Sequence, residues 1–195
     1  MVGVFGTLLA ALAGIGLGLA AGWRGGWTES IVMRLADVQL AFPSVLIALF
    51  IMARWGAGLS KIVIAVGIAH WVIYARTVRA SVLAEREKEY VSAATALGAR
   101  PSRIVLRHIL PNILEPVVVI SAVQFASVVM LEATLSFLGL GVPITQPSLG
   151  MLIRFGFDEF ATGSWWIWLF PGLTLMILVL SLNWLADRLR DRQLP

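Results

Sequence analysis

The feature that most constrains the fold is a series of apolar segments, each near the length that crosses a lipid bilayer. A helix needs about 20 predominantly apolar residues to span the hydrocarbon core. Such segments recur along the chain and predict spans at 2–21, 38–53, 62–78, 113–138 and 165–185. Only 13% of the residues are charged, about half of the roughly 25% typical of soluble domains. We therefore predict an all-α polytopic membrane protein with about five transmembrane helices.

Two local patterns refine the first two spans. Gly14, Gly18 and Gly22 recur at every fourth position of the first span, and small residues at this spacing let another helix approach closely. Pro43 lies near the start of the second span, where its ring disturbs a helix and its nitrogen cannot donate a hydrogen bond. We expect Pro43 to kink this span or to break it into an interfacial piece and a spanning piece.

One long polar interval, residues 85–111, separates the third and fourth spans. A helix over residues 90–97 would place Tyr90, Ala94 and Leu97 on one face. Gly98 then stands where a residue in the left-handed conformation would end this helix. Because Ala93 and Ala94 are small, this side of the interval could fit closely into a groove on a partner.

The second half of the interval is basic. Pro101 can begin a second short helix, because its missing N–H is not needed at the first helical position. Arg100, Arg103 and Arg107 would share a face of that helix, and Pro111 is expected to end it. This basic face has a simple alternative explanation, which is contact with anionic lipid headgroups at about 1 kcal/mol per residue.

The Lys and Arg residues are distributed unequally among the connections. With residues 23–37, residues 76–111 and the C-terminus on one side of the membrane, that side holds twelve of the fifteen, including Arg188, Arg190 and Arg192. The other side holds Arg54, Lys61 and Arg154. Because cytoplasmic connections carry the excess of positive charge, we predict that the polar interval and the C-terminus are cytoplasmic. Five spans then leave the N-terminus outside.

The polar interval also resembles a known motif. Ser92-Ala93-Ala94, followed by Gly98 and by His108-Ile109-Leu110-Pro111, is similar to the EAA motif of bacterial ABC-importer permeases. In that family the loop forms a coupling helix that docks into a groove on a cytoplasmic ATPase. The resemblance implies a coupling role for Tyr90, Ser92, Ala93, Ala94, Leu97, Gly98, Leu110 and Pro111. Ser92 departs from the pattern, because the family usually has Glu there.

Further motifs indicate one branch of this family. The run LSFLGLGV at 135–142, with shorter matches from residue 21 to residue 172, resembles the permeases of dipeptides, oligopeptides and nickel. That branch usually has six spans and both termini in the cytoplasm, whereas this sequence begins at the second span of the pattern. We interpret the sequence as truncated rather than as a shortened gene product. Residues 1–195 would form a single permease domain that contains the coupling loop 85–111.

The resemblance implies a type I ABC importer transmembrane domain of the MetI-like fold, working by alternating access in the bacterial inner membrane. Its expected partners are a homologous second permease, two cytoplasmic ATPases and an extracytoplasmic binding protein, all acting at the lipid bilayer. Di- or oligopeptides are the expected substrates, with nickel as the alternative. No cofactor is expected on this chain, since ATP and Mg²⁺ would bind the ATPase subunits.

The residues themselves predict no enzymatic, metal or nucleic-acid site. The chain has no G-x-x-x-x-G-K-[ST] motif, which is the sequence that cradles phosphates. With two His residues and no Cys, a multi-histidine or cysteine metal site is not expected. The basic residues flank apolar spans, which is typical of a membrane protein rather than of a nucleic-acid partner.

Two ionisable residues within the spans, His70 and Glu132, are candidates for the transport path, because intramembrane charges are often functional. We favour a hydrogen-bonded packing role for His70, and Gln124 also suits a bond between helices. A bond from Glu132 to a neighbouring helix or loop is at least as consistent with its place near the outer end. Proton transfer through either residue would instead indicate a proton-coupled secondary transporter, although no inverted half-repeats are visible. An inactive truncated permease remnant is the other alternative.

Overall fold

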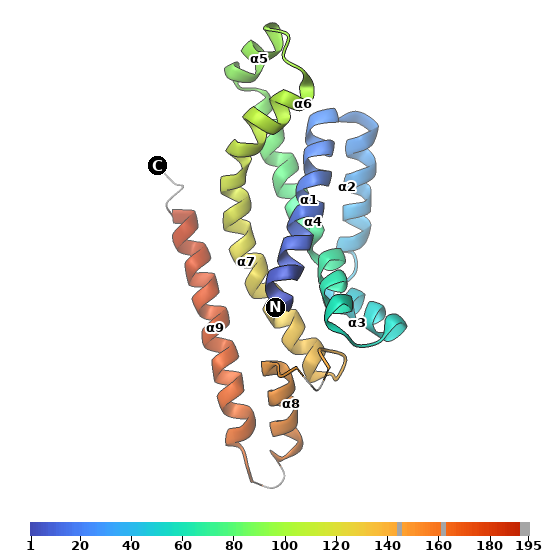
Figure 1. Cartoon of the computed structure of the whole chain (residues 1–195), viewed down its shortest axis with the longest axis vertical. Coiled ribbons are helices and arrows are strands. Elements are labelled where there is room, and N and C mark those ends of the chain that lie inside the picture. Colours follow the sequence, from blue (N-terminus) through green and yellow to red (C-terminus); the bar gives the residue numbers. More distant parts are fainter. Residues whose placement is uncertain (144–145, 161–162, 192–195) are drawn as a thin grey trace.

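Long helices that run up and down one axis make up the chain in the computed structural model (Figure 1). The structure describes residues 1–143, 146–160 and 163–191, and every regular element in these ranges is helical. In chain order they are α1 (Val2–Arg24), α2 (Gly26–Leu40), α3 (Ser44–Trp55), α4 (Leu59–Arg86), α5 (Glu89–Ala96), α6 (Pro101–Ile104), the π-helical turn η1 (Val105–Ile109), α7 (Leu110–Phe137), α8 (Leu149–Asp158) and α9 (Trp166–Asp191). Within these described ranges, four helices are long and apolar enough to cross a membrane, and the number of spans is up to five if the bent pair α2–α3 counts as one. The all-α membrane architecture is thereby confirmed.

The partner of the glycine stripe is α4, which packs along α1 (Figure 1). A Cβ atom added at Gly14 would lie 2.4 Å from the Tyr74 Cβ and 2.5 Å from the Trp71 carbonyl oxygen. One added at Gly18 would lie 2.7 Å from the Ala75 carbonyl oxygen. Only glycine leaves room for backbones this close, so the predicted close approach of a second helix is confirmed.

The second span begins earlier than predicted and is broken. Residues 23–37, predicted to be a connecting loop, instead form the end of α1 and most of α2, which runs back beside α1. The chain turns after Leu40, and α3 leaves the turn at 86° to α2. Pro43 is the residue directly before α3. The predicted break at Pro43 is confirmed, whereas the predicted bounds of the span, 38–53, are wrong.

Ion pairs with α4 explain why α2 is helical despite its charges. Asp37 accepts a hydrogen bond from Arg76, and Glu29 accepts one from the Arg79 Nε atom at 2.8 Å. Because these pairs compensate one another's charge, α2 can lie among the spans although its composition is not apolar. Arg76 and Arg79 belong to α4. The count of Lys and Arg residues on each side of the membrane instead assigns them to the connection 76–111.

The remaining spans complete the bundle. α7 packs against α1 and α4, and α9 packs against α7 and α8. The segment 139–164, for which the sequence predicts only a loop, contains α8, whose N-terminus is capped by the Ser148 side chain accepting a 3.2 Å bond from the Met151 N–H. Arg188 and Arg190 lie in the last turn of α9. Arg192 lies outside the described residues.

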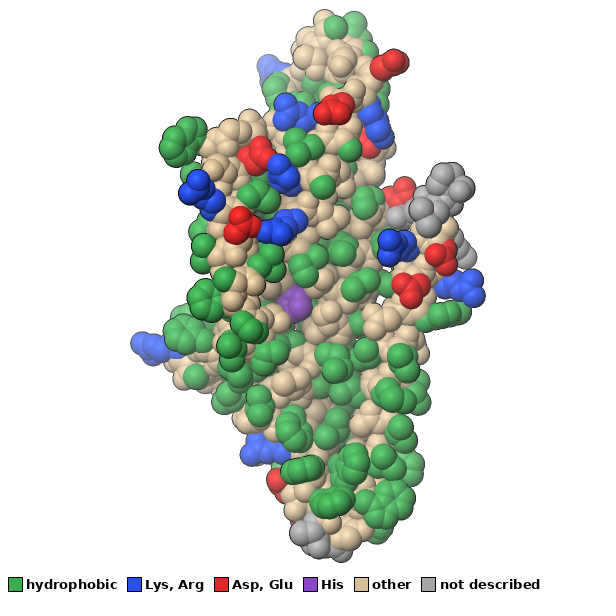
Figure 2. Space-filling model, turned by 180° about the vertical axis from the view of Figure 1, so that it is seen from behind, with side chains coloured by type: hydrophobic (Ala, Val, Ile, Leu, Met, Phe, Trp, Pro, Cys, Tyr) green, Lys and Arg blue, Asp and Glu red, His purple; other side chains and the backbone are tan. Residues whose placement is uncertain are grey.

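The polar interval is fastened to the bundle by a buried apolar cluster at one end. This cluster joins α4, α5, α6, η1 and α7 through Tyr74, Val78, Val82, Val91, Ile104, Ile109 and Ile113. Charged side chains gather in the half of the molecule that carries α5 and α6, above a largely hydrophobic half (Figure 2). The charged side chains are thus concentrated towards the end of the molecule that carries α5 and α6.

Candidate functional site

The first half of the polar interval folds as predicted. α5 ends at Ala96, and Gly98 adopts a left-handed conformation with φ of 76°. The Ala99 N–H donates to the Ala94 carbonyl oxygen at 3.1 Å, and the Gly98 N–H donates to the Thr95 carbonyl oxygen at 2.9 Å. These two bonds form a Schellman motif, which requires a left-handed residue and so favours glycine. The predicted cap at Gly98 is confirmed.

The second half begins as predicted but does not end as predicted. Pro101 is at the start of α6, and α6 passes through η1 directly into α7. Pro111 does not end a helix, and that prediction is wrong. It lies at the second position of α7, directly after the π-helical turn η1, where the regular α-helical hydrogen-bond pattern is already interrupted. The second half of the interval is therefore continuous with the fourth span.

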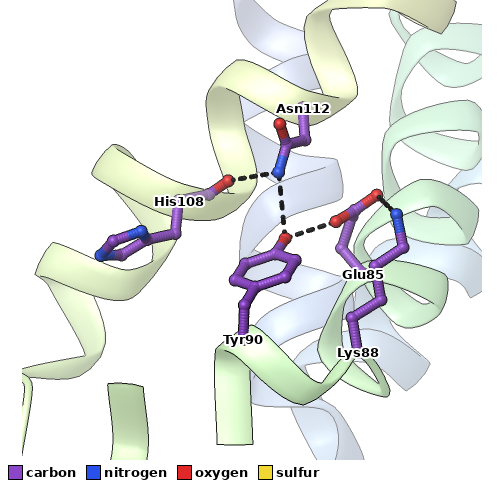
Figure 3. A network of polar contacts seen from close by, with 5 residues as sticks. All are labelled: Glu85, Lys88, Tyr90, His108 and Asn112. Atoms are coloured by element: carbon purple, nitrogen blue, oxygen red, sulfur yellow. Dashed lines mark hydrogen bonds and ion pairs between the residues drawn. The ribbon is translucent and has the colours of Figure 1, made fainter. Parts of the chain in front are cut away.

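A polar network joins the interval to two spanning helices (Figure 3). Glu85, buried near the end of α4, accepts hydrogen bonds from Lys88 Nζ at 2.6 Å and from the Tyr90 hydroxyl. Asn112, in the first turn of α7, donates from Nδ2 to the Tyr90 hydroxyl at 3.2 Å and to the His108 carbonyl oxygen at 3.0 Å. One carboxylate and one phenol thus connect α4, the start of α5 and the start of α7.

Both donors to this carboxylate keep their protons at neutral pH. The hydrogen bond to Glu85 raises the pKa of Lys88 above its usual value. Burial, and then the hydrogen bond to Glu85, raises the pKa of the Tyr90 hydroxyl. Because both groups already titrate near pH 10 when unperturbed, the network stays intact across the physiological range.

The outward surface of α5 differs from the predicted face. Tyr90 and Ala94 are half-buried and pack against the apolar cluster below, whereas Ser92 and Ala93 are exposed. Leu97 is 88% exposed at the tip of the loop. Of the predicted docking residues, Ala93 and Leu97 are therefore accessible, whereas the bond to Glu85 and the apolar cluster turn Tyr90 and Ala94 partly inward. The docking role itself stays a prediction.

The rest of the interval presents a mixed apolar and basic surface. Gly98 and Pro111 are exposed, and Leu110 is half-buried against the cluster. A shallow cavity of about 530 Å³ follows the loop tip, lined by Gly98, Ala99, Arg100, Ser102, Arg103 and Leu106. Leu106 is 62% exposed. The surface around this cavity therefore combines exposed leucines with exposed arginines.

The two intramembrane candidates have local structural partners. His70 is buried, and its Nδ1 atom lies 2.8 Å from the Gln124 Oε1 atom, which joins α4 to α7 as the packing role predicts. Its Nε2 atom has no partner among the described residues, and the ring borders a cavity of about 390 Å³ between α3, α4, α7 and α9. Glu132 accepts a 2.7 Å bond from Ser136 on its own helix, and the bond suggested to a neighbouring helix or loop stays a prediction.

Several residues of the site were not predicted from the sequence. They are Glu85, Lys88 and Asn112, which form the polar network with Tyr90. For the pair Glu85–Lys88 a local signal exists, because a Glu and a Lys three positions apart at a helix end can reach one another. No local signal indicates that Tyr90 would reach Asn112. Among the described residues, no group of three or more His, Cys, Asp or Glu side chains could hold a metal ion.

Comparisons with known proteins give a consistent result. A family model described as "Binding-protein-dependent transport system inner membrane component" matches residues 14–194. A putative peptide transport system permease protein of Brucella suis is 42% identical over 190 residues, which are 97% of this chain and 64% of that protein. The dipeptide transport system permease protein DppC of Alkalihalophilus pseudofirmus is 39% identical over 97% of this chain and 62% of its own length. The chain therefore spans less than two thirds of the length of either relative.

A solved structure shares the fold. The MetNI methionine ABC transporter in inward-facing conformations contains a chain that superposes with a TM-score of 0.72 at 20% sequence identity, covering 97% of this chain and 90% of that one. At this identity the likeness concerns the helical arrangement alone.

Proposed function

The chain belongs to the family of binding-protein-dependent transport system inner membrane components, and on that basis we propose that it is the permease subunit of an ATP-driven ABC importer. Its substrates would be di- or oligopeptides that an extracytoplasmic binding protein delivers. The names of both sequence relatives refer to peptides, and this favours peptides over nickel.

The observation that carries the proposal is the helical interval 85–111 at the polar end of the bundle. Leu97 and Leu106 project from it with 88% and 62% of their surfaces exposed, beside the exposed Arg100 and Arg103. Burying such a side chain in a partner's groove stabilises a complex by about 1.5–3 kcal/mol. We propose that this surface docks on a cytoplasmic ATPase, with exposed Ser92, Ala93, Leu97 and Gly98 at the contact.

The structure suggests how movement of the ATPase would reach the transport path. The Glu85 carboxylate joins α4 to α5 through Tyr90, and Asn112 extends the same network to α7. The Pro101–Phe137 segment is also one continuous helical stretch. A displacement of α5 would therefore move both spanning helices together, and this is the coupled motion that alternating access requires.

The proposal also covers orientation, partners and cofactors. Residues 85–111 and the C-terminus would face the cytoplasm of a bacterial inner membrane, as the excess of basic residues predicts. A second, homologous permease and two ATPases would complete the complex, and ATP and Mg²⁺ would bind the ATPases. Residues 1–195 would act as one permease domain, and Tyr90, Ala94, Leu110 and Pro111 would support the docking surface from beneath or beside it.

Energy coupling tests the proposal. The complex is isolated through a tag on this chain, reconstituted into liposomes with its binding protein, and supplied with a labelled dipeptide or with ⁶³Ni²⁺. We expect dipeptide uptake that requires hydrolysable ATP and is unaffected by a protonophore. Uptake driven by a pH gradient without ATP would instead establish the proton-coupled alternative, and uptake of ⁶³Ni²⁺ alone would contradict the peptide assignment.

A further inference from the structure

A cavity with a partly polar lining lies between α3, α4, α7 and α9, outside the polar interval. Its volume is about 390 Å³, which leaves room for several water molecules at about 30 Å³ each. In the described part of the chain no Asp, Glu, Lys or Arg lines it. Each of the four helices instead contributes at least one neutral hydrogen-bonding side chain, and these are Ser44, His70, Ser127, Thr134 and Asn183.

The cavity lies among spanning helices. Three of its four helices, α4, α7 and α9, belong to segments that are long and apolar enough to cross a membrane. His70 is eleven residues after Leu59 at the start of α4 and sixteen before Arg86 at its end, which is about 16 Å and about 24 Å. Polar groups in such surroundings need partners in the protein or in water, because lipid offers none. The remaining lining residues are apolar: Val45, Ala126, Met130, Leu131 and Val179.

One hydrogen-bonding atom beside the cavity has no partner in the described part of the chain. His70 is 6% exposed, and its Nδ1 atom lies 2.8 Å from the Gln124 Oε1 atom. Because an amide oxygen only accepts, Nδ1 carries the hydrogen, and Nε2 of the neutral ring is then an acceptor. Gln124 does not line the cavity and His70 does, so the ring meets the cavity with its other edge. Nε2, on that edge, has no partner among the described residues, and a buried acceptor of this kind needs a donor.

The other polar side chains of the cavity can hold such a donor. The Ser127 and Thr134 hydroxyls donate to the Val123 and Met130 carbonyl oxygens of their own helix, at 3.3 and 2.8 Å. Their oxygen atoms can therefore still accept. The Asn183 side chain makes no hydrogen bond to a described residue, and its amide offers two N–H donors and one acceptor. A small molecule with both donors and acceptors can bond to α4, α7 and α9 at once.

We propose that this cavity is a hydrated binding site for small molecules with N–H or O–H donors, and that the His70 Nε2 atom accepts a hydrogen bond from the molecule held there. Water is one such donor, and the amide or ammonium N–H of a peptide is another. Binding of water is independent of the function proposed above, whereas binding of a peptide rests on it. The bound molecule would also connect α4 with α9, because Asn183 reaches the same cavity.

Hydration is tested by the reactivity of single thiols, since the chain has no Cys. Ser127→Cys and Thr134→Cys place a thiol in the cavity, and Leu180→Cys places one on α9 at a residue that is 59% exposed and does not line it. The reconstituted complex is treated with a permanently charged methanethiosulfonate, with and without ATP, and labelling in denaturant gives the reference. Because the thiolate is the reactive form and needs water to form, both cavity positions should react at least about tenfold faster than Leu180→Cys in one nucleotide state. Equal rates at all three positions, or faster reaction at Leu180→Cys, would overturn the proposal.

The hydrogen bond at Nε2 is tested by ¹⁵N NMR of the full chain, labelled with [¹⁵N]histidine and reconstituted in liposomes. The chain has two His residues, so the His108→Gln variant identifies the signals of His70. We expect a ring with hydrogen on Nδ1 and a hydrogen-bonded acceptor at Nε2, and transfer of magnetisation from water to this ring about as fast as to the half-buried His108 ring. A changed Nε2 signal on addition of glycylglycine would identify the peptide as a donor, and an unchanged one would identify water. A free lone pair at Nε2 with slow transfer from water would overturn the proposal.

Failure of this proposal differs from failure of the proposed function. A wild-type complex that imports no peptide under any energy source would refute the function, whatever the thiol reactivity and the NMR signals of His70. A wild-type complex that imports peptides normally, with a cavity closed to water and to the charged reagent, would refute only the inference about the cavity.

Discussion

Replacing Gly14 and Gly16 by Ala provides a matched pair of changes in one helix. The two glycines are two positions apart in α1, so both substitutions give the same gain in helix propensity, about 0.5–1 kcal/mol. Their surroundings differ completely. A Cβ at Gly16 meets nothing within 4 Å, whereas a Cβ at Gly14 meets Tyr74 and the Trp71 backbone at 2.4 and 2.5 Å.

The size of the effect follows from these distances. Ordinary van der Waals contact begins at about 3.4 Å, so the 2.4 Å contact requires α1 and α4 to separate locally by about 1 Å. Overpacking of this kind typically costs about 1–3 kcal/mol. Gly16→Ala should therefore stabilise the protein slightly, and Gly14→Ala should be less stable than Gly16→Ala by about 1–3 kcal/mol.

The measurement is unfolding of the detergent-solubilised chain by sodium dodecyl sulfate, followed by the fluorescence of its eight Trp residues. The free energies of unfolding of the two variants and the wild type are compared at one detergent composition. Equal stability of Gly14→Ala and Gly16→Ala would refute the close packing of α1 on α4, because the only difference between the two sites is the space available for a methyl group.

Three further variants test the interval and the core. Tyr90→Phe removes the hydroxyl that donates to Glu85 and should weaken the attachment of α5 by about 1–2 kcal/mol. Trypsin should therefore cut the native complex faster near Lys88, and unchanged cleavage would contradict the role of this bond. Gly98→Ala places a side chain on a residue with φ of 76°, which costs about 1–2 kcal/mol, and should also speed cleavage at Arg100; protection equal to the wild type would argue against the left-handed cap. Gln124→Leu leaves the buried His70 Nδ1 atom without its partner, which costs about 1–3 kcal/mol. The variant should therefore have a lower thermal stability in detergent, and unaltered stability would mean that this bond does not hold α4 to α7.

The features that the sequence predicts correctly depend on local backbone geometry. Gly98 and Pro101 mark the end of one helix and the start of the next, because each requires a backbone conformation that few residues adopt or a hydrogen bond that proline cannot make. The stripe Gly14, Gly18 and Gly22 predicts a close helix neighbour because only small residues permit one. These inferences need no knowledge of distant parts of the chain.

The features that escape prediction depend on contacts between distant residues. Asp37 and Glu29 make α2 look like a loop, and only their partners on α4, 39 and 50 positions away, show that it packs among the spans. Tyr90 turns inward because its hydroxyl donates to Glu85 and accepts a hydrogen bond from Asn112, which is 22 positions away. A search for apolar segments or for a shared helix face cannot detect such pairing.

The α6–η1–α7 connection shows a third kind of error. Pro111 lies where a proline ordinarily ends a helix, and the sequence alone gives no sign of the π-helical turn that precedes it. The turn lets the chain enter α7 with Pro111 in its first turn. The consequence for function is that the second half of the interval and the fourth span form one continuous element.

The central claim is that the interval 85–111 transmits ATP hydrolysis to the spanning helices, and the number of peptides imported per ATP hydrolysed tests it most directly. Leu97→Ala removes an 88% exposed side chain at the loop tip, and Leu8→Ala removes a 53% exposed leucine of α1 as the control. At about 2 kcal/mol for the lost contact, Leu97→Ala should lower this ratio about tenfold or more at equal amounts of membrane-inserted complex, while Leu8→Ala leaves it unchanged. An unchanged ratio in Leu97→Ala would contradict the claim.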